Sequence, residues 1–188
     1  MGRRKGRGQL MIIPYDRRAA VAYAHRWAYS RNPAYYDYSQ IGGDCTNFAS
    51  QCLYAGTGVM NYIPTFGWYY IDANNKSPSW TGVPYFYNFM TREDRSPGPF
   101  GTNLSAENIN LLLPGDFVQL RFTKDEFEHT PIIVEIRSPL SLDNILIAAH
   151  SNDADYRPLS TYNFKELRFI HIFGAYPSAS SANMETIP

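Results

Sequence analysis

The spacing of apolar positions predicts two core-facing helices in the first third of the chain. The first covers residues 15–30 and the second residues 44–55, and small or apolar residues recur three and four positions apart in both. Asp44 stands where an N-cap is expected, and Gly56 stands where a helix commonly stops. The apolar stripes consist of Ala20, Tyr23, Ala24, Trp27 and Ala28 in the first helix, and of Cys45, Phe48, Ala49, Cys52, Leu53 and Gly56 in the second.

Short apolar runs predict that the last third of the chain is rich in strands. A turn at 113–116 leads into the first run, and turn residues separate the others. We therefore expect a small, mostly antiparallel sheet, with the N-terminal helices packed on it, in an α+β fold. The expected strands are 117–122, 132–136, 145–149 and 169–173.

Residues 57–103 form an aromatic-rich insertion between these two parts. A short strand is expected at 68–71 and a short helix at 83–90. The aromatic side chains suggest two alternatives, a groove that binds substrate or simple packing of the insertion against the body. Trp68 and Trp80 are the candidates for substrate binding, with Tyr85, Phe86 and Tyr87 beside them.

Composition indicates one globular domain of residues 15–176 in a chain of 188 residues, 44% of them hydrophobic and 18% charged. We expect residues 1–14 to be a basic flexible segment and residues 177–188 to be a flexible tail. The formal net charge is zero and no basic face extends the N-terminal cluster, so no nucleic-acid partner is expected. No run is long enough to span a membrane.

The compartment stays open at this level. No signal peptide is recognisable in the chain. If the chain is a fragment of a larger exported protein, the domain works outside the cell or in the cell wall; otherwise it is cytoplasmic.

Cys45 directly follows Gly42-Gly43-Asp44 at the expected start of the second helix. The partial positive charge of a helix N-terminus favours a thiolate, and the thiolate is the nucleophile. Cys52 lies two turns further on, about 10 Å along the helix, which is too far for a disulfide with Cys45. It falls on the apolar stripe and is expected to be a core residue.

A cysteine nucleophile needs a base and a group that orients the base. His129 opens the strand expected at 132–136, where Pro131 is tolerated. A hairpin centred near residue 140 would bring residues near 151 opposite His129. Asn152 and His150 are therefore the candidates for the orienting residue, followed by Asp153, and the strand register decides between them.

An oxyanion hole would use the backbone N–H of Cys45 and a side chain of the preceding loop. Gln40 is the first candidate for that side chain and Tyr38 the second. A metal site made of Cys45, His129, His150 and Asp153 is the rival reading, but its spacing matches no zinc motif. We therefore expect no metal and no cofactor.

Residues 43–56, Gly-Asp-Cys-Thr-Asn-Phe-Ala-Ser-Gln-Cys-Leu-Tyr-Ala-Gly, closely resemble the signature of a bacterial amidase domain family of the amidase 6 type. This family is similar to papain-like Cys-His hydrolases such as the NlpC/P60 and CHAP cell-wall enzymes. The resemblance covers most of residues 15–176 and implies a papain-like fold. It also implies that Cys45 is the nucleophile and His129 the base, whereas the third residue varies among relatives. Pro131 is a mild departure from the pattern.

The resulting hypothesis is a cysteine-dependent amide hydrolase that works through a thioester. By analogy, its substrate is a peptide or a peptidoglycan-stem amide. One alternative is an acyltransferase or transpeptidase, in which an amine replaces water. Another is a non-catalytic binding module on the same fold, which the aromatic insertion would serve.

Overall fold

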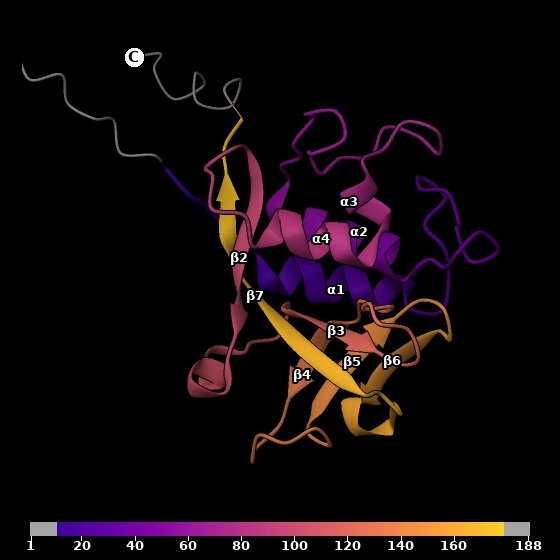
Figure 1. The fold of residues 1–188 in the computed structure, drawn as a ribbon, viewed down its shortest axis with the longest axis vertical. Coiled ribbons are helices and arrows are strands. Elements are labelled where there is room, and N and C mark those ends of the chain that lie inside the picture. The colour runs from indigo at the N-terminus through magenta and orange to yellow at the C-terminus, as the bar shows by residue number, and fades with distance from the viewer. Residues whose placement is uncertain (1–10, 179–188) are drawn as a thin grey trace, which may run out of the picture.

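The computed structural model describes residues 11–178, in which helices pack over a curved antiparallel sheet (Figure 1). The basic cluster near the N-terminus and most of the expected C-terminal tail lie outside the described residues. Within the described part, the helices are α1 (Arg17–Trp27), α2 (Cys45–Thr57), α3 (Pro78–Thr81) and α4 (Val83–Met90). The strands are β1 (Ile13–Pro14), β2 (Gly98–Leu104), β3 (Phe117–Arg121), β4 (Ile132–Ile136), β5 (Ile145–Ala149), β6 (Ala154–Pro158) and β7 (Glu166–Tyr176).

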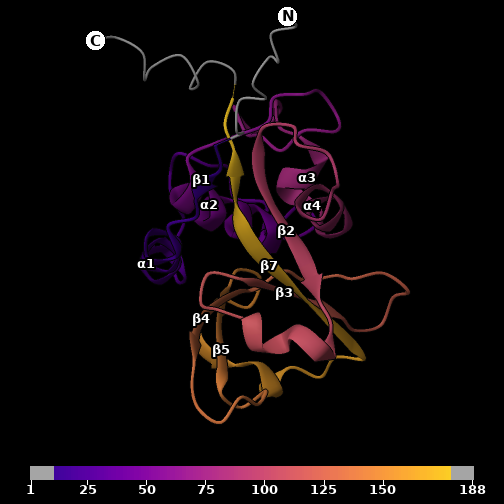
Figure 2. The same cartoon turned by 90° about the vertical axis from the view of Figure 1, so that its left-hand side faces the viewer.

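Across residues 11–178, the strands form one sheet in the order β1-β7-β3-β4-β5-β6, and β2 also pairs with β7. The pairings are antiparallel. The first part of β7 pairs with β3, and β2 follows β7 along most of its length. Figure 2 shows β2 and β7 as a long ribbon that runs from the strand-rich half past the helices. Thus β7 connects the two halves of the molecule.

The core lies on both faces of the sheet because strand side chains alternate between them. On one face, Phe117, Ile132 and Ile170 pack against helix residues such as Phe48 and Leu53. On the other face, the curled strands and two short 3₁₀ helices, Ala106–Leu111 and Leu159–Thr161, enclose a second cluster. The second cluster includes Val118, Leu120, Ile133, Ile147 and Leu159.

The strongest periodic patterns predicted their elements well. The helix expected at 83–90 and the strands expected at 132–136 and 145–149 have those bounds in the structure. The first helix is shorter than expected at both ends, and the Asp16 side chain fixes its start by accepting the N–H of Ala19 at 2.9 Å.

The expected stop at Gly56 is wrong. Helix α2 continues through Gly56 to Thr57 and ends at Gly58, which has the left-handed φ of 65° typical of a helix end. Gly56 serves close packing, since a Cβ there would overlap the Tyr15 ring.

The sequence analysis missed three strands, β1, β2 and β6. Strand β2 contains Gly98, Pro99 and Gly101, which are unfavourable in strands, and is defined by its pairing with β7. Strand β1 lies inside the segment expected to be flexible and pairs with the end of β7. Conversely, residues 68–71 form only isolated bridges in place of the expected strand.

The expectation that Trp68 and Trp80 line a groove is wrong. Both side chains are fully buried, and their rings pack together with centroids 4.7 Å apart. The indole N–H of Trp68 donates to Ser50 at 3.0 Å, and that of Trp80 donates to Asn47 at 2.9 Å. The two tryptophans therefore fix the insertion to α2, which is the packing alternative. No helix in residues 11–178 has the length and apolar character to cross a membrane.

Candidate active site

Cys45 is the first residue of α2, and its side chain faces the segment that carries His129. Its Sγ lies 4.0 Å from the carbonyl oxygen of Glu128 and 3.7 Å from the hydroxyl of Thr46. The backbone N–H of Thr130 also points to the sulfur. The thiol thus contacts the backbone on both sides of His129, and it is 8% exposed.

Burial changes the expected chemistry of this thiol. The sequence suggested a thiol that ionises readily, but desolvation raises the pKa of Cys45 above its ordinary value. The hydrogen bonds from Thr130 and Thr46 oppose this effect and do not overcome it. The structure therefore does not support the readily formed thiolate that the helix position suggested, because burial disfavours the charged form.

His129 lies just before β4, where its backbone bridges to Leu120. Its ring is buried, with Nε2 3.5 Å from the hydroxyl of Tyr162. Burial, assisted by the positive charge of Arg157, lowers the pKa of His129 to about 4. The imidazole is therefore neutral at neutral pH.

His129 borders a cavity of about 430 Å³ at this end of the sheet. The cavity is large enough for part of a small ligand. Besides His129, its walls include Phe122, Glu128, Ser151, Asn152, Arg157, Tyr162 and Asn163.

Tyr162 was missed by the sequence analysis. It follows the 3₁₀ helix Leu159–Thr161, and the guanidinium of Arg157 stacks 3.7 Å from its ring centroid. Arg157 is held in turn by the Thr161 hydroxyl at 2.7 Å. A single tyrosine in a polar loop gives no signal in the sequence, because only the fold brings it to His129.

His150, expected to orient His129, has other partners. Its Nδ1 lies 2.6 Å from a carboxylate oxygen of Asp44, and its Nε2 lies 2.9 Å from the carbonyl oxygen of Trp27. The ring also stacks on Phe48 with centroids 3.9 Å apart. Because both ring nitrogens are occupied, the structure does not support His150 as the partner of His129.

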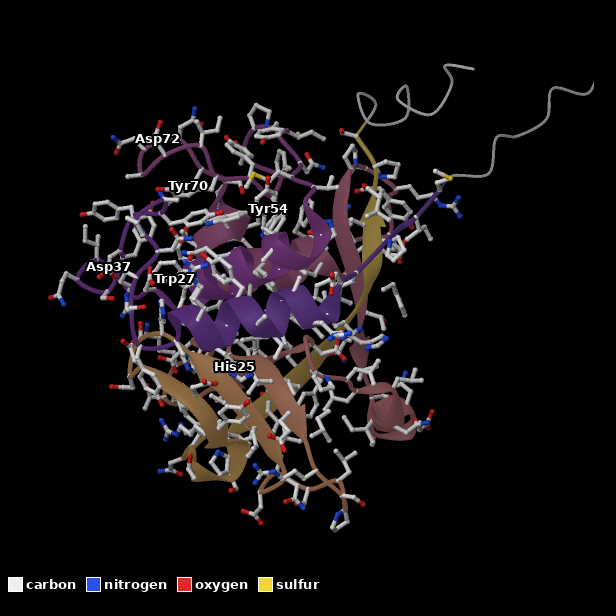
Figure 3. The ribbon with its side chains drawn as sticks, turned by 180° about the vertical axis from the view of Figure 1, so that it is seen from behind. His25, Trp27, Asp37, Tyr54, Tyr70 and Asp72 are labelled. Atoms are coloured by element: carbon white, nitrogen blue, oxygen red, sulfur yellow. The ribbon has the colours of Figure 1, made fainter. Side chains whose placement is uncertain are left out.

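Asp44 is the centre of a buried hydrogen-bond network at the start of α2. It is the N-cap residue of α2, as expected, but its side chain makes no capping hydrogen bond. Instead it accepts the N–H of Tyr38 at 3.0 Å and the amide of Asn47 at 2.8 Å, besides contacting His150. Arg31 lies 3.7 Å from the same carboxylate. This network holds the loop before Cys45 in place. In Figure 3, Trp27 and Asp37 lie near this end of the helices, and His25 lies on the side of α1 that faces the strands.

The turn between β5 and β6 brings Ser151 and Asn152 to the cavity. Both have positive φ, 64° and 74°, which is the conformation of a type I′ hairpin turn. The Ser151 hydroxyl accepts the backbone N–H of Asp44 at 3.0 Å. Asn152 is exposed and lines the cavity without a side-chain hydrogen bond to another described residue. Asp153 points away and pairs with Arg31 at 2.9 Å.

The expected oxyanion donors differ in their placement. The backbone N–H of Cys45 has no hydrogen-bond partner within residues 11–178, so it is free to bind an oxyanion. Gln40 is exposed in the preceding loop, and the Tyr38 hydroxyl donates to the carbonyl oxygen of Ala73 at 3.2 Å. Neither side chain joins the cavity wall.

Metal-binding side chains do not gather in the described part of the chain, where no group of three or more His, Cys, Asp or Glu is placed to hold an ion. His171 contacts Asp116 at 2.7 Å, and Arg17 contacts the same carboxylate at 2.7 Å. This second Asp-His pair ties α1 to β7 and lies outside the cavity wall.

The chain belongs to the family described as "Putative amidase domain", whose model matches residues 14–173. It is similar to the uncharacterized protein YhbB of Bacillus subtilis (strain 168), with 35% identity over 123 residues. The matched region is 64% of this chain and 37% of that protein, so the chain covers only part of its relative's length. No solved structure matches the chain.

Proposed function

We propose that this domain is a cysteine-dependent amide hydrolase with Cys45 as nucleophile and His129 as base. The observation that carries the proposal is the contact of Cys45 Sγ with the backbone on both sides of His129, next to a cavity that His129 borders. Membership in an amidase family supports amide bonds as the target. The substrate class we propose is a peptide or a peptidoglycan-stem amide.

The proposed reaction begins from a neutral pair. Burial disfavours both the Cys45 thiolate and the His129 imidazolium, so an ion pair is not the resting state. As the sulfur bonds to the amide carbon, His129 takes the thiol proton. The same proton then passes to the leaving amine as the C–N bond breaks. Water, deprotonated by His129, hydrolyses the thioester and restores the thiol.

Tyr162 is the proposed partner of His129 during this transfer. Its hydroxyl oxygen, 3.5 Å from Nε2, can accept the N–H of the imidazolium that forms. A phenol supplies less charge stabilisation than a carboxylate, which agrees with a base of low pKa. Contacts of this kind are commonly loose before substrate binds and tighten in the transition state.

The developing oxyanion would be bound by the free backbone N–H of Cys45. Ser151 is the proposed second donor, since its oxygen already accepts the N–H of Asp44 and its own proton is free to turn toward the cavity. This assignment replaces Gln40, whose side chain is exposed outside the cavity wall.

The experiment is covalent trapping on peptidoglycan-stem peptides. The protein is mixed with these peptides, the reaction is quenched in acid, and the protein is digested. The mass of the peptide that contains Cys45 is then measured by mass spectrometry. An acyl group on Cys45 together with a released amine is expected. Cys52→Ala protein serves as the control that keeps Cys45. Amine release without an adduct, and undiminished in Cys45→Ala, would overturn the proposal.

A further inference from the structure

Arg168 on β7 is an arginine held rigidly by neutral groups. Its guanidinium lies between two aromatic rings, with Cζ 3.4 Å from the centroid of Tyr87 and 4.0 Å from that of Phe127. Two of its nitrogens, Nε and Nη2, donate to the same side-chain oxygen of Gln119. The planar cation is thus fixed in one orientation before any ligand arrives.

The charge of Arg168 is not neutralised within residues 11–178. No carboxylate there forms an ion pair with it, and its third nitrogen, Nη1, has no hydrogen-bond partner in the same range. Glu166, the acidic residue beside it, is paired with Arg121 at 2.8 Å. Burial lowers the pKa of Arg168 from its ordinary value, and the nearby negative charge of Glu166 opposes this shift without overcoming it.

Arg168 lines a cavity of about 620 Å³, which is within the range of small-molecule sites. The walls carry the two stacking rings together with Leu104, Ile109 and Phe169. None of its wall residues belongs to the cavity that contains His129. Asn103, Ser105 and Glu166 also line this cavity, and the Glu166 carboxylate is paired with Arg121. The site is therefore a second, mainly apolar cavity in which Arg168 is the one cation of the wall.

Hydrogen bonds join this second cavity to the proposed nucleophile. The amide of Gln119, which is fully buried, donates to the Thr130 hydroxyl at 3.1 Å. Thr130 in turn contacts the Thr46 hydroxyl at 3.2 Å, and Thr46 contacts Cys45 Sγ at 3.7 Å. The Arg168 cavity and Cys45 are thus separated by three side chains in mutual contact.

We propose that the Arg168 cavity binds the free carboxylate of a peptide whose terminal residue has an apolar side chain. The guanidinium presents the open Nη1 to the carboxylate, as arginine does at carboxylate sites elsewhere. The aromatic and aliphatic walls receive the apolar side chain. The proposal depends on the placement of Arg168 and does not depend on the proposed hydrolysis.

The test compares two probes that differ only in charge, N-acetylphenylalanine and its carboxamide. Binding to the full chain is followed by calorimetry and by NMR shifts of Tyr87 and Phe127. A hydrogen bond to a charged group contributes about 1.5–3 kcal/mol, so the acid should bind roughly tenfold more tightly or better. Cys45→Ala should bind both probes unchanged, which separates this site from the fate of the hydrolase proposal.

Two substitutions test whether the preference for the acid over the carboxamide arises at Arg168. Arg168→Gln should remove it, with circular dichroism checking the fold, since this variant also loses two cation–π contacts. Ala106→Glu keeps Arg168 and adds a carboxylate to the cavity wall. It should therefore weaken binding of the acid and leave binding of the carboxamide unchanged, and Ala106→Gln is its matched control. The proposal is overturned if wild type does not prefer the acid up to about 20 mM, if Ala106→Glu binds the acid as tightly as Ala106→Gln does, or if the preference survives in folded Arg168→Gln.

Discussion

His129 and His150 lie at neighbouring strand ends but in opposite chemical settings. His150, after β5, has both ring nitrogens occupied by Asp44 and the Trp27 carbonyl oxygen. His129, before β4, has one loose contact with the Tyr162 hydroxyl and faces a cavity. The comparison teaches that the histidine with strong partners fixes the structure, whereas the one with few partners keeps a nitrogen free to move a proton.

The Asp116–His171 pair repeats the structural pattern. Asp116 is fully buried, contacts His171 and Arg17, and accepts the backbone N–H groups of Leu113 and Ile172. His25 is likewise paired, 2.9 Å from Asp155. Among the histidines of the described chain, His129 alone is not paired with a carboxylate.

The largest expected effect separates the two cysteines of α2. Cys45→Ala should lower kcat/KM by roughly 10³-fold or more, because it removes the proposed nucleophile. Cys52→Ala should leave kcat/KM nearly unchanged and lower the free energy of unfolding by about 1 kcal/mol, because Cys52 is fully buried in the core. Steady-state assays and urea denaturation measure the two quantities. Equal loss of activity in both variants would contradict the assignment.

The next effect tests the two histidines directly. His129→Gln should lower kcat by roughly 10²–10⁴-fold, because it removes the proposed base. His150→Gln should mainly lower the free energy of unfolding, by about 3 kcal/mol, because the Asp44 carboxylate loses a buried partner. If His150→Gln were stable but inactive while His129→Gln stayed active, His150 would be the base and His129 the structural histidine.

A pH profile should show the low pKa of the base. Because burial and Arg157 lower the pKa of His129 to about 4, the base is protonated and idle only below that pH. The value of kcat/KM should therefore rise as the pH increases through about 4 and be level by pH 6. Arg157→Gln removes the nearby positive charge, so the acid limb should move to higher pH. A limb that stays in place in that variant would show that Arg157 does not act on His129.

The smallest expected effect concerns the Tyr162 hydroxyl. Tyr162→Phe keeps the ring beneath Arg157 and removes the hydroxyl, which contacts Nε2 of His129 and also hydrogen-bonds with Arg157. We expect kcat to fall about tenfold with KM nearly constant, since one hydrogen bond to a forming cation contributes about 1.5 kcal/mol. A change in KM alone would indicate a binding role instead of a role in orienting the base.

The sequence predicted the elements with strong periodicity and most of what each one buries. Helix α4 and strands β4 and β5 were found because their apolar spacing is decisive within a few residues. Strand β2 was missed because Gly98, Pro99 and Gly101 disfavour a strand locally. Its pairing with β7, about 70 residues away in the sequence, is a tertiary effect.

The candidate site was likewise predicted only where local sequence signals were enough. Cys45 could be recognised from its place at a helix start, and hairpin pairing brought the 150–153 region near His129. The partners of His150 could not be foreseen, because Asp44 lies over 100 residues earlier in the chain. The raised pKa of Cys45 depends on burial, which helix position alone does not reveal.

The most direct test of the central claim is an NMR titration of the His129 ring nitrogens between pH 3 and 8. The account predicts a neutral imidazole at pH 7 and a pKa of about 4 for His129, with Tyr162→Phe still neutral at pH 7. An imidazolium at pH 7 that disappears in Cys45→Ala would mean a resting thiolate–imidazolium pair. That result would contradict the neutral pair from which the proposed reaction starts.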